Sequence, residues 1–169
     1  LAHMHLAGQD FEHEQPNLRG LPWWNETAPL VYPHLDSAQS ALLQSELAYQ
    51  NHIAASAEYQ ALPRGPVHAD LFRDNAIFEG EKLSGCFDFY FAGVDTWLFD
   101  LCVCLNDWAI THADGLHEPQ RAQALLDAYQ AVRPLTAAER QLLPAMARAA
   151  ALRYWISRLW DFYLPRQAS

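Results

Sequence analysis

One short segment of the sequence concentrates side chains that could transfer a proton and hold a metal ion. Asp70 and Asn75 are five positions apart within the segment His68–Asn75, and Asp88 follows thirteen residues after Asn75. A carboxylate can accept the proton of a hydroxyl nucleophile. Amide and carboxylate oxygens are hard ligands that suit Mg²⁺, which keeps several waters and bridges substrate phosphates. These residue types predict a catalytic base, Asp70, beside two magnesium ligands, Asn75 and Asp88. The alternative is that each of the three only forms a local turn or cap.

The elements around this segment would have to bring the three side chains together. Residues 76–79 and 83–89 are largely apolar, and Gly80-Glu81-Lys82 separates them as a turn, which is typical of a β-hairpin. Because a hairpin folds back on itself, Asp88 at the end of its second strand is expected to return close to Asn75. A His-x-Asp-x-x-x-x-Asn pattern alone is weakly specific. With the hairpin and the second aspartate it matches the layout of kinases, which place a catalytic aspartate beside an asparagine and an aspartate on the metal.

Helical periodicity and capping signals dominate the rest of the chain. Val67 is expected to begin a short strand, and Thr136 with Glu139 forms a predicted capping box. The fold class is therefore α+β, mostly α-helical, with one small β-hairpin that carries the catalytic and metal residues. The expected helices cover residues 1–8, 23–35 (broken by Pro29 and Pro33), 37–60, 97–111, 118–133 and 137–163.

Four residues near the motif have supporting or open roles. His68, at the base of the loop, is expected to orient the backbone by hydrogen bonding. Asp100 lies in an apolar helix start, and because a buried carboxylate needs partners, we expect it to brace the catalytic loop. Arg73 has two possible partners, the substrate or Asp74, and Asp74 itself is expected to be solvated.

Composition and charge narrow the class of protein. The chain has 169 residues, of which 51% are hydrophobic, enough for one domain with a substantial core. Its 11 Lys and Arg against 20 Asp and Glu give a net charge of −9, which disfavours nucleic acid as a partner. The three cysteines, Cys86, Cys102 and Cys104, form no Cys-x-x-Cys pair and are expected to be free thiols. No window reaches the roughly 18 apolar residues of a membrane span, so a cytoplasmic location without membrane partners is predicted.

The motif segments resemble the aminoglycoside phosphotransferase and choline kinase-like superfamily, whose fold is that of the protein kinases. This likeness lies in residues 67–75, 86–92 and 98–101. Within the superfamily, further segments are similar to the homoserine kinases of the kinase-like type, and the likeness covers nearly the whole chain. These further segments are residues 20–23, 105–108 and 152–159.

The resemblance implies an ATP-dependent phosphotransferase. It implies transfer of the ATP γ-phosphate to the side-chain hydroxyl of L-homoserine, a step of threonine biosynthesis, with ATP and Mg²⁺ as the cofactors. Carried over residue by residue, Asp70 would be the catalytic base, and Asn75 and Asp88 the magnesium ligands. His68 and Asp100 would support the catalytic loop.

The acceptor would be a small zwitterion, which needs a partner for its carboxylate. Arginine binds carboxylates through two parallel hydrogen bonds, so Arg153 and Arg158 are candidates. They are five positions apart in the last helix, so at most one is expected to face the site. Asn106 and Trp108 are candidates for lining the acceptor pocket. The alternatives are a surface or structural role for each arginine and core packing for Trp108.

The sequence departs from the superfamily in one respect. It has no glycine-rich loop and no strand lysine, since Lys82, the only lysine, lies in the hairpin turn. We therefore expect residues 1–169 to form a single domain, the carboxyl-terminal lobe, without the amino-terminal nucleotide lobe, and to be inactive alone.

The alternatives are an aminoglycoside- or choline-type kinase, or a fragment that only binds. A metal hydrolase using His3, His5 and His13 is disfavoured because His3 and His5, two apart on a helix, face different directions.

Overall fold

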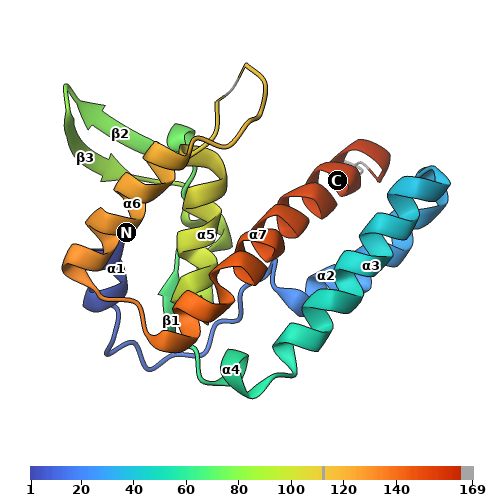
Figure 1. The fold of residues 1–169 in the computed structure, drawn as a ribbon, viewed down its shortest axis with the longest axis horizontal. Coiled ribbons are helices and arrows are strands. Elements are labelled where there is room, and N and C mark those ends of the chain that lie inside the picture. The colour runs from blue at the N-terminus through green and yellow to red at the C-terminus, as the bar shows by residue number, and fades with distance from the viewer. Residues whose placement is uncertain (112, 165–169) are drawn as a thin grey trace.

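The computed structural model describes residues 1–111 and 113–164, which form a mainly helical chain with two small antiparallel sheets (Figure 1). This confirms a mixed, mostly helical fold class. The elements in chain order are α1 (Ala2–Ala7), α2 (Leu21–Val31), the 3₁₀ helix η1 (Tyr32–His34), α3 (Ser37–Ala54), α4 (Ala57–Gln60), β1 (Arg64–Val67), η2 (Arg73–Asn75), β2 (Ala76–Glu79), β3 (Lys82–Cys86), η3 (Phe89–Phe91), β4 (Gly93–Thr96), α5 (Trp97–Trp108), α6 (Pro119–Val132) and α7 (Ala137–Tyr163).

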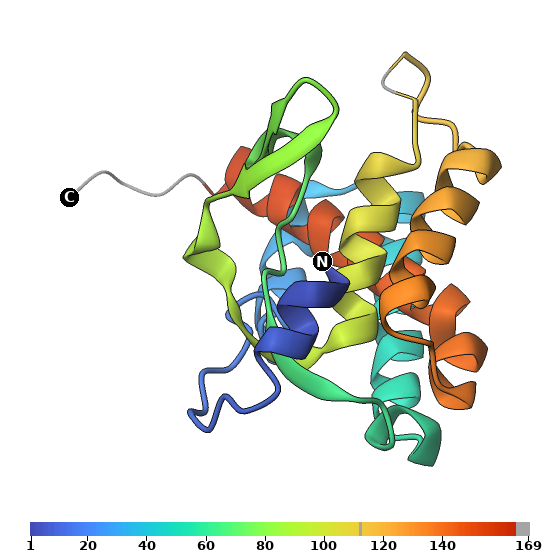
Figure 2. The ribbon, with the colours of Figure 1, turned by 90° about the vertical axis from the view of Figure 1, so that its left-hand side faces the viewer.

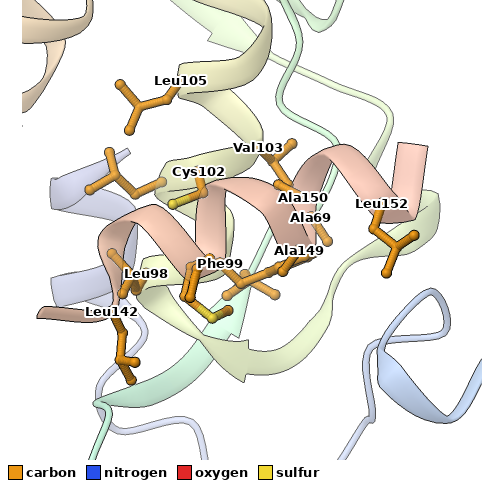
Figure 3. Close-up of a cluster of buried hydrophobic side chains, with 14 of the residues drawn as sticks. Ala69, Leu98, Phe99, Cys102, Val103, Leu105, Leu142, Ala149, Ala150 and Leu152 are labelled. Atoms are coloured by element: carbon orange, nitrogen blue, oxygen red, sulfur yellow. The ribbon is translucent and has the colours of Figure 1, made fainter. Parts of the chain in front are cut away.

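Helix α5 forms the centre of the fold because its first nine residues are apolar on nearly every side. All residues from Trp97 to Leu105 are buried, as expected for a helix that is covered all round. Its main partner is α7, whose small residues Ala149 and Ala150 lie against α5 in the core (Figure 3). On its other side α7 packs against α2 and α3 (Figure 1).

Local capping residues set several helix starts. The Thr136 hydroxyl accepts a hydrogen bond from the Glu139 amide at 3.1 Å, and Glu139 Oε2 accepts one from the Thr136 amide at 2.8 Å. This confirms the capping box at the start of α7. Asp36 and Thr96 likewise accept hydrogen bonds from the first turns of α3 and α5, which satisfies amides that have no partner within the helix.

Three predicted helices have clearly different bounds, and one of them, α5, ends at Trp108 instead of residue 111. The expected helix up to residue 60 is interrupted, because Ser56 accepts a hydrogen bond from the Tyr59 amide and so begins the separate helix α4. Helix α2 begins at Leu21 and continues through Pro29, so this proline does not break it. In the part of the chain that the structure describes, no helix combines the length and the apolar character needed to cross a membrane.

The first sheet was only partly predicted. Val67 ends strand β1 instead of beginning it, and β1 pairs antiparallel with β4, which was not predicted. The register pairs Arg64 with Thr96 and Val67 with Gly93. Because α5 follows β4 directly, this pairing holds β1 beside the start of α5.

The predicted hairpin is confirmed as β2 and β3, which stand out from the helices next to α1 (Figure 2). Strand β3 ends at Cys86, earlier than predicted, because Asp88 adopts a left-handed conformation with φ 63° and ψ 57° that an extended strand does not allow. The register pairs Ala76 with Cys86, and the Phe87 amide donates to the Asn75 carbonyl at 3.1 Å. The hairpin therefore returns Asp88 to the neighbourhood of Asn75.

The three cysteines are free thiols, as predicted. Cys102 and Cys104 are buried in the core, and burial raises the pKa of both thiols. A buried thiol with a raised pKa is a packing residue with little reactivity. Cys86 is half-buried and lies with its Sγ 3.9 Å from Met4 Sδ, where the hairpin meets α1.

Candidate active site

The three residues of the predicted chemistry line one cavity. This cavity of about 640 Å³ lies between the loop after β1, the segment after the hairpin and helix α7. Asp70, Asn75 and Asp88 all contribute to its wall. The structure thus brings together the side chains that the motif spacing grouped, while their roles as base and metal ligands stay predictions.

Asp100 fixes the backbone immediately before Asp70. Its side chain is fully buried, and its two oxygens accept hydrogen bonds from the amides of His68 at 3.0 Å and Ala69 at 2.7 Å. Ala69 has φ 62°, a left-handed conformation that costs energy in a residue other than glycine. The two hydrogen bonds to Asp100 offset this strain and set the direction in which the chain leaves toward Asp70.

A third partner of Asp100 is His5. The sequence analysis considered His5 only as a possible metal ligand. Arg133 donates to the Tyr129 hydroxyl at 3.2 Å, so this hydroxyl directs its own proton to His5 Nδ1, 2.7 Å away. His5 Nε2 then donates to Asp100 Oδ2 at 3.0 Å. Burial raises the pKa of Tyr129 to about 12, which keeps the phenol protonated for this role. A histidine on the apolar face of a helix was the only signal that could have suggested this contact.

His68 links the catalytic loop to the segment that carries Asp88. Its Nε2 donates to the Phe87 carbonyl at 3.0 Å, and its ring lies 4.5 Å from the Phe89 ring, centroid to centroid. These contacts come from the residues on either side of Asp88. The side chain of His68 therefore connects the loop to both flanks of a predicted metal ligand.

Asn75 and Asp88 offer oxygen atoms that fit a magnesium ion. Asn75 Nδ2 donates to the Asp70 carbonyl at 2.8 Å, so the oxygen Oδ1 of the same amide takes no part in this hydrogen bond. Within residues 1–111 and 113–164, the structure gives neither this Oδ1 nor the exposed Asp88 carboxylate a hydrogen bond or ion pair. The same residues contain no group of three or more His, Cys, Asp or Glu that could hold a metal. Mg²⁺ fits such a sparse set, because it binds through one or two protein groups with waters and substrate phosphates.

Both candidate arginines of α7 reach the cavity, although the spacing predicted at most one. Arg153 is buried, and its Nη1 lies 2.8 Å from Asp70 Oδ1. Arg158 is exposed and pairs with Asp161 at 2.6 Å. The prediction was wrong because the cavity extends along more than two turns of α7, from Arg153 to Asp161, and so receives side chains from two adjacent faces of the helix.

Arg73 pairs with Asp107 and not with its neighbour Asp74 in the described chain, while a contact with substrate stays a prediction. Its Nε lies 3.2 Å from Asp107 Oδ2, and the same oxygen accepts a hydrogen bond from the Arg73 amide at 2.7 Å. Asp107 thus anchors the loop from the end of α5. Asp74 is exposed, as expected.

The structure places Asn106 and Trp108 outside the cavity of Asp70. Asn106 donates to the Ala147 carbonyl at 2.8 Å and lines a neighbouring cavity of about 610 Å³, which Arg153 also borders. Trp108 donates from Nε1 to the Leu71 carbonyl at 3.0 Å and faces an apolar cavity on the side of α1 and α6. Trp108 therefore contacts the backbone of the loop instead of the space in front of Asp70.

One cationic residue of the cavity was not anticipated by the sequence analysis. Arg19, from the segment between α1 and α2, lines the same wall as Asp70 and Arg153. No spacing rule relates it to the catalytic motif, from which it is separated by about fifty residues. The only feature of the sequence that could have suggested a site role for this arginine is its place in the aromatic-rich segment Arg19–Trp24.

Comparison with known proteins gives a consistent result. The model of the phosphotransferase enzyme family matches residues 1–135. The chain is 62% identical to the homoserine kinase of Polaromonas naphthalenivorans, covering all of this chain and 54% of the relative. It is 59% and 58% identical to the homoserine kinases of Cupriavidus necator and Ralstonia pickettii, covering 99% of this chain and 52% of each relative. The chain therefore spans about half the length of the curated relatives that it matches.

Proposed function

The chain belongs to the phosphotransferase enzyme family, and from this premise we propose that it is the catalytic part of a homoserine kinase. The proposed reaction transfers the γ-phosphate of ATP to the side-chain hydroxyl of L-homoserine. The observation that carries it is the convergence of Asp70, Asn75 and Asp88 on one cavity. Identities of 55–62% to proteins named homoserine kinase, over nearly the whole chain, support the choice of acceptor.

Asp70 acts as the base in this proposal. Its carboxylate accepts the proton of the acceptor hydroxyl while the hydroxyl oxygen forms a bond to the γ-phosphorus, and the bond from this phosphorus to the β–γ bridging oxygen breaks to release ADP. Arg153, 2.8 Å away, holds the carboxylate in the cavity. The backbone of Asp70 is fixed from the other side, because Asn75 donates to its carbonyl.

Asn75 Oδ1 and the Asp88 carboxylate would hold the magnesium ion. Such an ion would neutralise the negative charge that develops on the phosphates of the nucleotide. The contribution of the chain itself is positional. His68 and the hairpin register keep Asn75 and Asp88 on the same wall of the cavity.

We further propose that residues 1–169 serve as the carboxyl-terminal lobe of a kinase-like fold. Two facts support this: the chain spans about half of its relatives, and the sequence contains no glycine-rich loop. Because positioning supplies most of the catalysis of phosphoryl transfer, this lobe alone should bind nucleotide weakly and turn over little. The cytoplasmic location, the place in threonine biosynthesis and the absence of nucleic-acid and membrane partners stay predictions.

A phosphotransfer assay tests the proposed function. The full-length protein is incubated with ATP, Mg²⁺ and one of three acceptors: L-homoserine, choline or an aminoglycoside. We expect ADP release and a phosphorylated product with homoserine alone. Phosphorylation of choline or the aminoglycoside without homoserine would assign the site to another acceptor class, and no phosphorylation of any acceptor would overturn the proposal.

Replacing Asp88 by asparagine should weaken magnesium binding. The variant loses one negative charge in the ligand set, so we expect the Mg²⁺ concentration for half-maximal rate to rise at least about tenfold. Because Asp88 is exposed and makes no hydrogen bond within the described residues, the melting temperature should stay unchanged. A magnesium titration of the full-length variant measures this effect, with the exposed α6 residue Asp127→Asn as the control. An unchanged magnesium dependence would remove Asp88 from the metal site.

A further inference from the structure

Arg153 is a buried arginine that contacts the proposed base and still has a donor without a partner. It lies near the middle of α7, and only 3% of its surface is exposed. Its Nη1 lies 2.8 Å from Asp70 Oδ1. Its Nε is also buried, but the part of the chain that the structure describes gives this atom no hydrogen-bond acceptor. Because a buried N–H donor without an acceptor is destabilising, the guanidinium has hydrogen-bonding capacity that the chain itself leaves unused.

Two aromatic rings hold the guanidinium of Arg153 in place. Its Cζ lies 5.3 Å from the centroid of the Phe91 ring and 5.9 Å from that of the Phe72 ring. Contacts of a cation with aromatic rings are favourable, and more so where water is excluded. Together with the ion pair to Asp70, these rings fix the orientation of the planar group before any ligand arrives. A group fixed in this way loses little conformational freedom when a ligand binds.

Arg153 lies at the junction of two cavities. It lines the cavity of about 640 Å³ that contains Asp70, and it also lines the neighbouring cavity of about 610 Å³. The predicted metal ligands Asn75 and Asp88 belong to the wall of the first cavity, whereas the second is bordered by the end of α5. A ligand can therefore reach the guanidinium from the space in front of the base and from space that lies away from the metal ligands.

Building on the proposed function, we propose that Arg153 binds the carboxylate of the acceptor and so selects an amino acid over an amino alcohol. A guanidinium carries several N–H donors in a planar fork, and it matches a carboxylate with two parallel hydrogen bonds. One such group can serve Asp70 at Nη1 and the acceptor carboxylate along another edge. The other arginine that α7 contributes to the cavity, Arg158, is exposed and pairs with Asp161.

The contact with Asp70 favours the acceptor over the nucleotide as the ligand of Arg153. The phosphates must lie beside Asn75 and Asp88, while the group that approaches the base is the acceptor hydroxyl. In L-homoserine a short carbon chain joins this hydroxyl to the carbon that bears the carboxylate. A guanidinium that touches the base is therefore within reach of the carboxylate when the hydroxyl is at Asp70. Arg153 would hold both ends of the reacting pair, the base and the acceptor.

The test compares acceptors with and without a carboxylate in the full-length protein. Arg153→Lys keeps a charge beside Asp70 but loses the planar fork. We expect kcat/KM for L-homoserine to fall about 100-fold, because the carboxylate loses its paired hydrogen bonds. For 3-aminopropan-1-ol, which keeps the hydroxyl and the amine but lacks the carboxylate, the fall should be less than about tenfold, since only the orientation of the base is disturbed. The KM for ATP should change less than about threefold.

Binding of an unreactive acceptor analogue gives a second readout, which does not depend on catalysis. L-2-aminobutyrate keeps the carboxylate and the amine but has no hydroxyl to phosphorylate. Its inhibition constant against homoserine should rise about 30-fold in Arg153→Gln, where a neutral amide replaces the guanidinium. In the unsubstituted protein, the neutral carboxamide of this analogue should inhibit at least about tenfold more weakly, a comparison that needs no variant to fold. Equal inhibition by the carboxylate and the carboxamide would overturn the proposal.

Further controls separate acceptor recognition from other roles of Arg153. Arg148→Gln alters an exposed arginine of α7 that pairs with Glu46, and should leave both acceptors unaffected. Equal losses with homoserine and the amino alcohol in Arg153→Lys would make Arg153 a partner of the base alone, which overturns its assignment to the acceptor. A rise in the KM for ATP instead would make it a phosphate ligand, which also overturns the assignment. If the unsubstituted protein does not phosphorylate homoserine, the proposed function itself fails, whereas homoserine activity that Arg153→Lys leaves intact defeats only this inference.

Discussion

Replacing Asp70 by asparagine is expected to lower the kcat of the full-length enzyme by about a thousandfold. Asparagine has nearly the same shape as aspartate, but it cannot take up the proton of the acceptor hydroxyl. A general base contributes about 10²–10⁴-fold to such a step. The loop should keep its conformation, because its hydrogen bonds from Phe72 and Asn75 go to the carbonyl of Asp70 and not to its side chain.

Steady-state kinetics with homoserine and ATP, together with a thermal melt, measure this effect. We expect the KM for ATP to change less than about threefold, since the proposed mechanism places the nucleotide beside the metal ligands and not at Asp70. The melting temperature should fall only slightly, because the asparagine oxygen can still accept a hydrogen bond from Arg153. Asp127→Asn, on the exposed face of α6, serves as the control for loss of one charge. If Asp70→Asn retains more than about a tenth of the kcat, Asp70 is not the base.

The sequence was sufficient for the parts of the fold that local chemistry determines. The capping residues Asp36, Thr96 and Thr136 each satisfy amides of the next turn, so their effect depends on a few neighbouring residues. The hairpin was predictable for the same reason, since the turn at Gly80, with φ 63°, joins strands that are adjacent in the chain. Such elements can be read from one stretch of sequence.

Contacts between distant segments were not predictable in this way. Strand β4 (Gly93–Thr96) has no alternation of apolar and polar residues, and it exists because β1, about thirty residues earlier, pairs with it. The same limit applied to the bounds of β1, where Val67 was predicted to start the strand that it ends. Nothing near Val67 in the sequence shows where its partner lies.

In the candidate site, too, the contacts between neighbouring segments were predicted and those between distant segments were not. Asp70, Asn75 and Asp88 were grouped because loop and hairpin are consecutive in the chain. The ion pair of Arg153 with Asp70 joins residues 83 positions apart. The spacing along α7 indicated only the helix face of each arginine, and not its partner. Arg19 reaches the cavity because its segment attaches to β4, an element that was itself not predicted. An error in the sheet thus concealed a residue of the site.

Asp100→Ala should be the most destabilising single substitution at the site. It would leave three buried donors without their acceptor: His5 Nε2 and the amides of His68 and Ala69. Removing the acceptor of a buried polar group costs about 1–3 kcal/mol for each donor, so the loss for three donors is at least about 3 kcal/mol. We expect the free energy of unfolding to fall by about 3–5 kcal/mol, a large share of the 5–15 kcal/mol that about 150-residue domains possess.

Thermal unfolding of the full-length protein measures this loss, which should lower the melting temperature by about 10 °C. Asp127→Ala, at an exposed position of α6, should change the free energy of unfolding by less than about 0.5 kcal/mol. Asp100→Asn separates charge from hydrogen bonding. It keeps one oxygen for the Ala69 amide but turns an N–H group toward the two other donors, so it should lose about half as much stability. A melting temperature of Asp100→Ala equal to that of Asp127→Ala would mean that the left-handed Ala69 is held by other contacts. In that case, the buried chain from Tyr129 through His5 would not be what positions Asp70.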